Sequence, residues 1–568
     1  METTRPERQA ERPERARWRG ATSRKLAERI VVEGTLQLQE PTHLGEGGEG
    51  DFVDMSLLVD TRDGGTPLLT GASVAGALRA HLRACDFGYR TPLPGPGSSQ
   101  DDADERQGPA VTLLGGFPGD EKGAQSPLVV DDAYGQLPDA ADGGVAVREG
   151  VSIKPETQTA DEGQLFDLNA WVAGTEFPLR FELLVSAHEE APARDDLMQA
   201  LCTALEGLQR GDIPFGLRKR RGYGEATVEK WRVRRYDMTD RQDLLAWLMG
   251  GADELDETNE HVQATDDLWK ALNVARSETD DHRTHFRLDA EFSLDGSLLI
   301  RSTPGAPSGG PDEVHLHALR PNGETEPVLS GTSLAGALRA RALKIAQTLA
   351  ARDETAQALV NGMFGFGPEE ETPGAEEDDP APHASRVETR ETVIGGDPET
   401  HLVQQRVSID RFTGGAYPGA LFDQQPVFGG ENTRVQVQLK HVKPGDRQGG
   451  DARCYSSALK GAGAAGVKPG DKQGGDARAE TSAGVPFDAE IGLLLLLLKD
   501  LWTSDLPLGG ERTIGRGRLK GKTAGLTLKD HGENQQWTIT RNDERLEIEG
   551  ASGDLEDYVT ALNKHLQR

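Results

Sequence analysis

The alternation of apolar and polar residues predicts strands in three separate parts of the chain. Residues 29–39 alternate as a strand with one buried face does, and residues 177–186 and 433–440 repeat the pattern. Residues 195–209 and 334–350 instead have the three- and four-residue spacing of an amphipathic helix. Glycine-rich stretches separate these elements and indicate loops.

The longest apolar run, residues 491–498, is expected to form one buried strand and is far shorter than the ~18 residues that span a membrane. Residues 1–25 are polar and arginine-rich, without the apolar core of a signal peptide. The cysteines Cys85, Cys202 and Cys454 lie too far apart for a disulfide framework or a zinc knuckle. We therefore expect a cytoplasmic protein with no membrane contact.

A ten-residue peptide occurs twice in the chain. Residues 71–80 return as residues 331–340 with eight of the ten positions identical. A Val-Ser-Ile tripeptide at 151–153 returns at 407–409, an offset of 256, and a Leu-Phe-Asp tripeptide that follows it returns with the same offset. Such self-similarity predicts a duplicated domain.

A glycine loop rich in basic residues follows each copy, at residues 218–224 and 512–518. Aligning Gly222 with Gly515 gives an offset of 293, so the second copy is longer. A Gly-, Pro- and charge-rich stretch within residues 441–482 accounts for the difference and is typical of a flexible insertion between two strands.

Each repeat reads as strand, glycine loop, helix, irregular region, strand, helix, glycine loop and strand. This order predicts an α+β fold of two tandem ferredoxin-like, RRM-like domains with large loop insertions. Residues 555–566 are expected to form a terminal helix. The expected segments are a polar basic tail (1–25), the first domain (26–239), an acidic helical linker (240–283), the second domain (284–530, with the insertion 441–482) and a C-terminal extension (531–568).

The net charge of −31, taken alone, argues against nucleic-acid binding. The acidic residues, however, gather in expected loops and linkers (100–106, 253–267 and 369–379), whereas basic residues gather in the glycine loops. Small residues at the start of each repeated helix leave N–H groups for a phosphate, and glycine loops let the backbone approach one. A tyrosine between two glycines is suited to stacking on a base. The candidate RNA-binding residues are Ser73, Arg79, Arg218, Lys219, Arg220, Arg221, Tyr223, Ser333, Arg339, Arg512, Arg516 and Arg518.

Three motifs of the second repeat, whose counterparts follow in the same order in the first, resemble those of the RAMP superfamily: Gly-x-Ser-x-x-Gly-x-Leu-Arg after a strand, Val-Ser-Ile-Asp-Arg-x-Thr at 407–413 and a Gly-Arg-Gly-Arg loop at 515–518. The resemblance implies a backbone subunit of a type III CRISPR effector complex in antiviral defence, with two such domains fused as in the III-D and III-E branches. It implies a β-hairpin thumb carrying Arg406, Arg411 and Thr413. Its implied partners are a guide RNA, a target RNA and other RAMP subunits.

The same resemblance places a catalytic aspartate on the loop before the repeated helix, which here is Asp54. Asp54 is expected to orient the ribose 2′-OH, to accept its proton or to hold Mg²⁺ or another divalent metal. Asp51 and Asp312 are alternatives. Counting back from the second peptide puts His315 where Asp54 lies in the first repeat, so the second repeat is expected to be weak or inactive.

Three functions remain open from the sequence. The first is an RNA-guided endoribonuclease subunit that cleaves complementary target RNA, and the second is a purely structural guide-binding subunit. The third is a ribonuclease that processes guide precursors with histidine acid–base chemistry, for which His43 and His81 are the candidates.

Overall fold

The computed structural model places most of both repeats. The residues it describes are 25–45, 56–60, 62, 65–89, 108–116, 125–139, 144–154, 157, 159–187, 192–249, 263–276, 281–302, 310–366, 383–395, 402–430, 432–442, 485–530, 532–542, 545–551 and 554–568. The expectations for the N-terminal tail, for Asp51 and Asp54, and for nearly all of the insertion therefore lie outside the described residues.

The first repeat is built on an antiparallel sheet in the order β10-β9-β1-β8-β4. Four of these strands and two helices occur along the chain in the order β1-α1-β4-β8-α4-β9. This is the ferredoxin-like arrangement that the sequence predicts. The elements are β1 (Leu26–Leu38), α1 (Gly71–Phe87), α3 (Gly108–Leu114), β4 (Leu128–Val130), β8 (Glu176–Ser186), α4 (Arg194–Gln209), β9 (Ala226–Asp237) and β10 (Gln263–Thr265).

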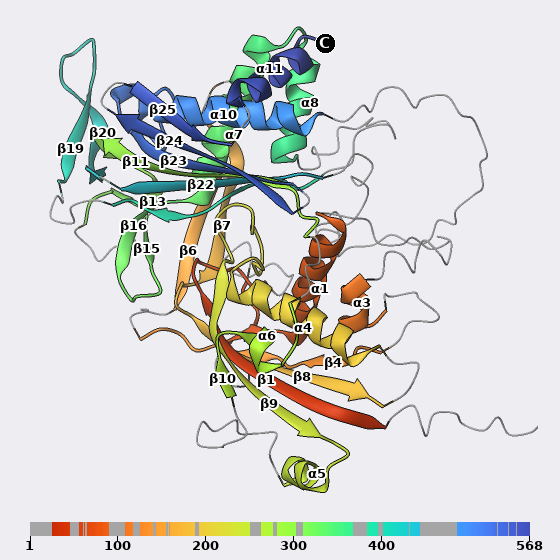
Figure 1. Cartoon of the computed structure of the whole chain (residues 1–568). Helices are drawn as coiled ribbons and strands as arrows, with labels where there is room; N and C mark the ends of the chain where they lie inside the picture. Colours follow the sequence, from red (N-terminus) through yellow and green to blue (C-terminus); the bar gives the residue numbers. More distant parts are fainter. Residues whose placement is uncertain are drawn as a thin grey trace, which may run out of the picture.

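The second repeat shares four strands with the first sheet and has β24 and β25 beside β23, where the first sheet has β10 beside β9; its order is β17-β22-β11-β23-β24-β25 (Figure 1). β23, β11, β22 and β17 take the places of β9, β1, β8 and β4. The elements are β11 (His285–Asp295), α7 (Gly331–Leu349), α8 (Asp353–Phe364), β17 (Val387–Thr389), β22 (Thr433–Lys440), α10 (Phe487–Trp502), β23 (Arg518–Asp530), β24 (Glu533–Asn542), β25 (Arg545–Gly550) and α11 (Leu555–Leu566).

Each repeat also carries a long β-hairpin, and the two hairpins have the same register. In β6 and β7, Val151 pairs with Leu165, and a register shift follows before the next pair. In β19 and β20, Val407 pairs with Leu421, and the shift follows at the equivalent place. Both residues of the second pair are numbered 256 higher than those of the first, which is the offset of the repeated tripeptides. The duplication therefore extends to individual residue pairs between the strands. The strands are β6 (Val145–Ile153), β7 (Ala160–Trp171), β19 (Gln404–Ile409) and β20 (Ala416–Gln425).

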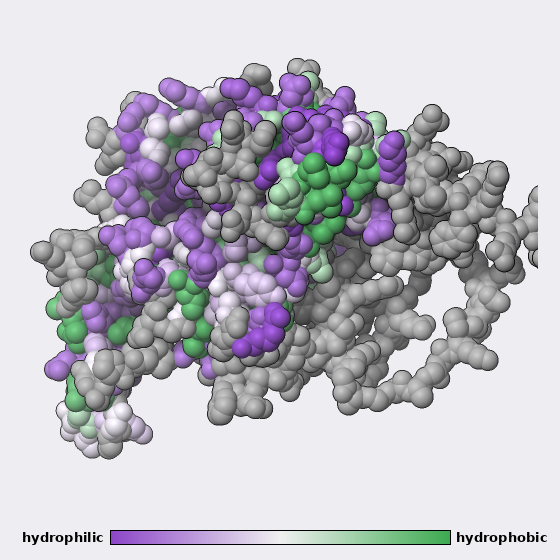
Figure 2. Space-filling model, turned by 90° about the horizontal axis from the view of Figure 1, so that it is seen from below, coloured by the Kyte–Doolittle hydropathy of each residue, from purple (hydrophilic) through white to green (hydrophobic). Residues whose placement is uncertain are grey.

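Short elements complete the described chain. The strands are β2 (Val59–Asp60), β3 (Thr66–Leu69), β5 (Ala133–Tyr134), β12 (Ser297–Leu298), β13 (Arg301–Ser302), β14 (Glu313–His315), β15 (His317–Leu319), β16 (Thr325–Leu329), β18 (Thr392–Val393) and β21 (Val427–Phe428). The helices are α5 (Arg241–Leu248), α6 (Leu268–Ala271) and the 3₁₀ turn η3 (Arg512–Ile514). Figure 2 shows a hydrophobic patch on the lower face, where α5 exposes Leu244, Leu245, Leu248 and Met249.

The prediction of a strand at residues 491–498 is wrong, because this run lies in the middle of α10. α10 packs against β23 on one side and α11 on the other, so residues around most of its circumference are buried. A helix buried all round has no polar stripe, and its apolar run cannot be told from a buried strand by periodicity. The terminal helix expected at 555–566 is confirmed as α11.

The segment 240–283, expected as a linker, contributes to the first repeat. Its strand β10 pairs with β9 and extends the first sheet. The C-terminal extension likewise adds β24 and β25 to the second sheet. Each repeat has its own hydrophobic core between its sheet and its helices. Among the described residues, no helix is long and apolar enough to cross a membrane.

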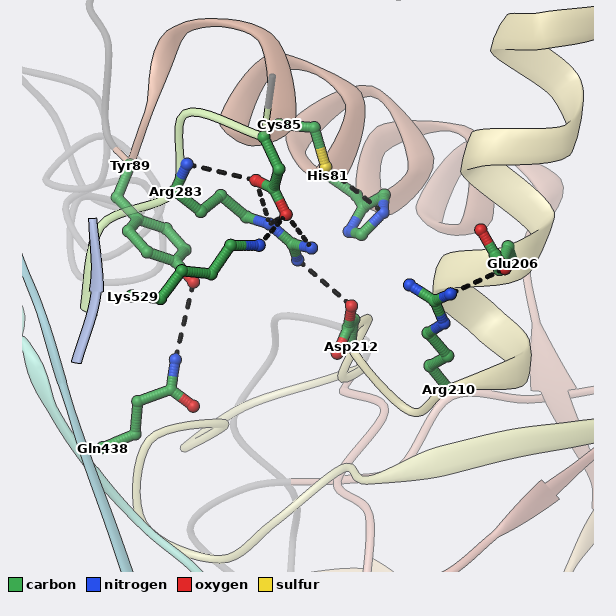
Figure 3. Close-up of polar contacts among 10 residues, drawn as sticks. His81, Cys85, Tyr89, Glu206, Arg210, Asp212, Arg283, Gln438 and Lys529 are labelled. Carbon is green, nitrogen blue, oxygen red and sulfur yellow. Dashed lines mark hydrogen bonds and ion pairs between the residues drawn. The ribbon is translucent and has the colours of Figure 1, made fainter. Parts of the chain in front are cut away.

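A polar cluster joins the two repeats beside α1 (Figure 3). Arg283, at the end of the segment that precedes β11, pairs with Asp281 and, at 3.1 Å, with Asp212 of the first repeat, and Lys529 of β23 also pairs with Asp281. Gln438 of β22 donates to the hydroxyl of Tyr89, and the backbone N–H of residue 282 donates to the carbonyl of Cys85. These contacts fix the end of α1 against the second sheet.

Candidate nucleic-acid interface

The starts of the two repeated helices are capped by the protein itself. Thr70 Oγ1 accepts a hydrogen bond from Ser73 N at 3.2 Å, and Ser330 Oγ accepts one from Ser333 N at 3.3 Å. In the first repeat, the carboxylate of Asp132 also accepts from the N–H of the first helical residue at 2.7 Å. These bonds satisfy N–H groups that a phosphate would otherwise use, so the helix starts are weaker candidates for anion binding than the sequence indicates.

The arginine two turns into each repeated helix binds the end of another helix. Arg79 donates to the carbonyl oxygens of Leu114 and Gly115 at 2.7 and 2.9 Å, at the end of α3. Arg339 donates to the carbonyl oxygen of Gly365 at 2.6 Å and to the Asn361 side chain at 2.9 Å, at the end of α8. Both guanidinium groups thus satisfy groups at helix C-termini, a structural role that accounts for their duplication.

The two glycine loops have the same backbone conformation. Arg218 and Glu511, which the alignment of the loops makes equivalent, adopt positive φ angles of 58° and 54°. Phe215 N donates to Gly224 O, and Leu508 N donates to Gly517 O, both at 2.9 Å. A Cβ on Gly224 or Gly517 would lie within 1.9 Å of the carbonyl oxygen of that same partner, so both positions require glycine.

The first loop carries four consecutive basic residues at the junction between the repeats. The guanidinium of Arg218 lies over the ring of Phe166 at 4.2 Å, and Arg220 pairs with Glu388 of the second repeat at 3.8 Å. Lys219 and Arg221 have exposed side chains. The ring of Tyr223, in contrast, is only 6 % exposed and packs with Leu168 and Ala170, so the expectation that it stacks on a base is wrong for this conformation.

The first loop also touches the start of the second repeat's helix. Arg221 forms a parallel bridge with Thr389, whose hydroxyl donates to Gly331 O at 2.8 Å. A Cβ on Gly331 would lie 2.5 Å from the carbonyl oxygen of Arg221. The structure therefore brings the basic loop of one repeat and the glycine helix of the other together, which the linear sequence does not show.

In the second repeat, Glu511 joins the glycine loop to the hairpin. Its carboxylate lies 3.1 Å from Arg516 and 3.5 Å from Arg406, and it accepts from Gln424 at 2.9 Å. Arg516 is 3 % exposed and also donates to Gln404 at 2.6 Å. Arg516 therefore holds the base of the hairpin, and Arg406, which is partly exposed, remains a candidate for contact with RNA.

The remaining candidates of the second repeat have exposed side chains, except Arg512, whose side chain is partly exposed. Arg411 and Thr413 occupy the tip of the β19–β20 hairpin, where the side chains of Thr413 and Asp410 are hydrogen-bonded at 3.0 Å. Phe412 between them is fully exposed. Arg512 begins the 3₁₀ turn η3, and Arg518 begins β23 with an exposed side chain.

The strand before each repeated helix shows that His315 is the counterpart of Leu57. Leu57 forms a β-bridge with Gly45, and His315 pairs with Arg301. Adding the hairpin offset of 256 to residue 45 gives residue 301, so Arg301 is the counterpart of Gly45. The neighbouring backbone hydrogen bonds support the same alignment. Residue 58 donates its N–H to the carbonyl oxygen of residue 44, and residue 316 donates its N–H to the carbonyl oxygen of residue 300. The offset on this strand is therefore 258.

Three residues before Leu57 is Asp54, and three residues before His315 is Asp312. The expectation that His315 replaces Asp54 is therefore wrong. The helix offset of 260 leads from residue 54 to residue 314, next to His315, and the true counterpart lies two residues earlier because the hairpin of β15 and β16 has two more residues between equivalent pairs than the hairpin of β2 and β3. Counting residues back from the helix ignores these two residues and therefore misaligns the loop that precedes the hairpin.

His315 itself is a structural residue. It is 1 % exposed, its Nδ1 accepts from Ile300 N at 3.1 Å, and its Nε2 donates to Val328 O at 3.0 Å. Burial lowers the pKa of His315 to about 4, so the ring stays neutral near pH 7. The histidine ties β14 to β16 and has no acid–base role.

Asp312 lies at the surface beside the base of the hairpin. Its Oδ2 accepts a hydrogen bond from Asp423 N at 2.9 Å, and β14, which follows it, runs parallel to β20. The described residues contain no group of three or more His, Cys, Asp or Glu side chains able to hold a metal ion. A single carboxylate fits Mg²⁺, which keeps waters and substrate phosphates among its ligands.

The two histidine candidates for guide processing are buried. His43 is 5 % exposed with Nδ1 2.6 Å from Asn169 O, and His81 is 8 % exposed beside Cys85. Burial lowers the pKa of both histidines, that of His81 to about 4. Burial also raises the pKa of the Cys85 thiol to about 11. Both histidines are buried from a substrate, and burial shifts the pKa of all three groups away from neutral pH.

The junction contains buried charges that the sequence reasoning missed. Glu391 of the second repeat pairs with Arg148 of β6 at 3.1 Å and donates from its backbone N to Glu40 Oε1 at 3.1 Å. Burial, together with Glu225 and Glu391, raises the pKa of Glu40 to about 8. No spacing in the sequence signals this group, because its members come from four distant segments.

Comparison with known proteins agrees with the duplication. The model of the RAMP superfamily matches the chain over two regions, residues 35–227 and 247–520. The two regions contain both hairpins and both glycine loops, and each ends within the first three residues of the strand that follows its loop, β9 or β23. A search of curated proteins found no match.

Proposed function

The chain belongs to the RAMP superfamily of CRISPR-associated RNA-binding proteins, and on that premise we propose that it is the guide-RNA-binding backbone subunit of a type III effector complex that cleaves complementary target RNA. Two RAMP units in one chain would each contact a stretch of the guide. The proposed partners are the guide RNA, the target RNA and other RAMP subunits.

The observation that carries the proposal is the meeting of three motifs at one place in the second repeat. Glu511 of the glycine loop contacts Arg406 and Gln424 of the hairpin, while Gln424 donates to Glu313 at 2.6 Å, next to Asp312. The glycine loop, the hairpin and the acid-bearing strand are far apart in the sequence. Their convergence supports a site where a phosphate backbone, a displaced nucleotide and a carboxylate meet.

The proposed RNA contacts are five basic side chains that the described structure leaves exposed or partly exposed. They are Lys219 and Arg221 in the first loop and Arg406, Arg411 and Arg512 in the second repeat. Cationic side chains replace the counterions of the phosphate backbone, and the glycines of each loop allow close approach. Arg79, Arg339 and Arg516 are excluded because they serve internal contacts.

The proposed reaction is attack of a ribose 2′-OH on the adjacent phosphorus, which needs the two groups in line. Asp54 would orient the hydroxyl or accept its proton in the first repeat. Asp312, its counterpart by strand register, would do so in the second. When bound, Mg²⁺ would supply charge stabilisation at the phosphate, held by the aspartate and by RNA oxygens.

The test is cleavage of a complementary RNA by the assembled complex carrying Asp54→Ala, with guide binding measured on the same preparation. The proposal expects loss of one cut with guide binding unchanged. If every cut persists, the chain is a structural guide-binding subunit. Asp60→Ala in β2 is the matched control. The carboxylate of Asp60 is already paired with Arg62 at 2.8 Å, so its loss is expected to leave every cut in place.

A further inference from the structure

The helix α5 carries apolar side chains on two opposite sides. On the inner side, Ala246 and Trp247 pack on the first sheet. The ring of Trp247 meets that of Tyr236 edge to face at 5.3 Å, and the guanidinium of Arg29 lies over the Trp247 ring at 4.3 Å. These contacts hold α5 on the face of the sheet that is not covered by α1 and α4 (Figure 1).

The outer side of α5 faces solvent in the described chain. Leu244, Leu245 and Leu248 have the three- and four-residue spacing that places side chains on one face of a helix, and Leu248 is 68 % exposed. Met249, at the end of the helix, is 85 % exposed beside them. A helix that is apolar on both sides normally has a neighbour on both. Among the residues that the structure describes, the outer stripe of α5 has no such neighbour.

The outer stripe is not part of the duplicated unit. In the first repeat α5 follows β9, whereas in the second repeat β24 follows β23, the counterpart of β9. The first six residues of α5 also lie between the two regions that the family model matches. The stripe is therefore a feature of this chain, and the contacts shared by RAMP units do not account for it.

α5 lies far from the basic loop of its own repeat. The glycine loop at residues 218–224 precedes β9 and α5 follows it, so the two are at opposite ends of a 12-residue strand (Figure 1). At about 3.3 Å per residue, this strand separates them by roughly 36 Å. A protein bound at α5 therefore leaves the first basic loop accessible to RNA.

The two ends of the outer stripe are complementary in charge. Arg241, the first residue of α5, has an exposed side chain and lies one turn before Leu244 and Leu245 on the same face. A cation is disfavoured at this end, because the helix dipole is positive there. The last turn of α5 carries no basic residue, so the negative end of the dipole has no counter-charge from its own helix. An antiparallel copy of α5 would place each arginine at the negative end of the other helix.

We propose that a second copy of the chain docks on α5, with the two α5 helices antiparallel across a two-fold axis that passes beside Leu245. The contact is isologous, since the same stripe serves both copies. Leu244 and Leu245 pack against the same residues of the second copy, and the stem of Arg241 covers Leu248 of that copy while its guanidinium reaches the carbonyl groups that end the helix. Because the contact is apolar and distant from the basic loop, it does not rest on guide binding or cleavage.

The test is sedimentation of the full chain without RNA, over a series from about 1 to 100 µM, the range expected for a small interface. The wild-type chain is expected to become a dimer as its concentration rises. Added salt should strengthen the dimer, because it screens the repulsion between two chains that each carry a net charge of −31. Leu248→Glu should weaken the dimer at least tenfold, since it places a charge in an apolar contact. Leu546→Glu on β25 is the matched control, because this leucine is also exposed, and it should dimerise as the wild type does.

Cysteine cross-linking tests the antiparallel arrangement, in a Cys454→Ser background. Leu245→Cys lies beside the proposed axis, where two Cα atoms can approach within the range of about 4.4–6.8 Å that a disulfide requires. Mild oxidation should therefore convert this variant into covalent dimers. Gln242→Cys, which is exposed on the flank of the same helix, is the control and should cross-link much less.

A wild-type chain that stays monomeric throughout the series overturns the proposal, as does a Leu248→Glu chain that dimerises normally. A dimer that salt dissolves, or equal cross-linking of the two cysteine variants, overturns the apolar antiparallel contact. If dimers form only in a chain lacking residues 1–24, the N-terminal tail covers the stripe and a second copy is not its occupant.

Discussion

Arg148 on the first hairpin donates to Glu391 of the second repeat at 3.1 Å, and both side chains are almost fully buried. The base of the first hairpin is thus held by a residue from the other repeat. In the second hairpin, the equivalent residue is Gln404, which accepts from Arg516 of its own repeat. The two hairpins share a register and differ in what anchors them.

Replacing Arg148 by Met is expected to destabilise the junction by about 3 kcal/mol, because Glu391 is then left without its main partner in a buried site. Calorimetry should show this as a lower melting temperature or as two separate transitions. The double variant with Glu391→Leu should recover much of the loss. Lys520→Met, which breaks an exposed pair with Asp295 at 3.0 Å, is expected to cost less than about 1 kcal/mol. An unchanged melting temperature for Arg148→Met would contradict the assignment.

The buried carboxyl of Glu40 predicts a pH dependence of stability. Burial raises its pKa from 4.5 to about 8, so between these values the folded chain holds a proton that the unfolded chain has lost. Stability should therefore fall as pH rises from 6 to 8, by up to about 2 kcal/mol. Glu40→Gln keeps an acceptor for Glu391 N and should flatten this slope in urea unfolding. Glu533→Gln on exposed surface should leave the slope as it is, and a Glu40→Gln chain with the wild-type slope would rule this cause out.

The helix-end arginines Arg79 and Arg339 should behave alike. Replacing either by Met removes two hydrogen bonds from a charged donor at a partly buried helix end, which is expected to cost about 1–3 kcal/mol. The melting temperature should drop for each variant, while the salt dependence of RNA binding stays unchanged for the folded protein. A reduced salt slope without a stability loss would return these residues to the RNA-binding set.

Lys219 and Arg221 should act in the opposite way. Replacing either by Gln is expected to reduce the slope of log K against log salt for a single-stranded RNA by about 0.7, with little change in melting temperature. Lys564→Gln is the matched control, since its side chain is exposed on α11, away from both loops. If both loop variants bind with the wild-type slope, the first loop does not contact the phosphates.

The sequence predicted the elements whose pattern depends on a half-buried surface. β1, β8, β22, α4 and α7 lie where alternation or helical spacing placed them, because each has one face in a core and one at the surface. The pattern failed at α10, which is buried on nearly all sides. Tyr223 looked exposed because it stands between two glycines, and only the packing against Leu168 shows that it is not.

The candidate site was harder to predict. Counting back from the repeated helix aligns the two aspartates only if both repeats have the same number of residues between the helix and the aspartate. The helix peptides are offset by 260 and the hairpins by 256, and the strand before each helix by 258. The offset rises by two residues between the hairpins and this strand and by two more at the helix, and only the backbone pairing shows at which positions these residues are inserted. The buried group of Glu40, Arg148 and Glu391 has no sequence signal at all, since it exists through contact between the repeats.

The central claim is that both repeats carry the aspartate, as Asp54 and Asp312. The most direct measurement is the cut pattern of a complementary RNA by the assembled complex containing Asp54→Asn, Asp312→Asn or both, with His315→Gln as a control of stability. The account predicts that each single variant loses a different cut, that the double variant loses both, and that His315→Gln loses none while melting at a lower temperature. A pattern that Asp312→Asn leaves unchanged, with guide binding intact, would contradict the equivalence of the two repeats in chemistry.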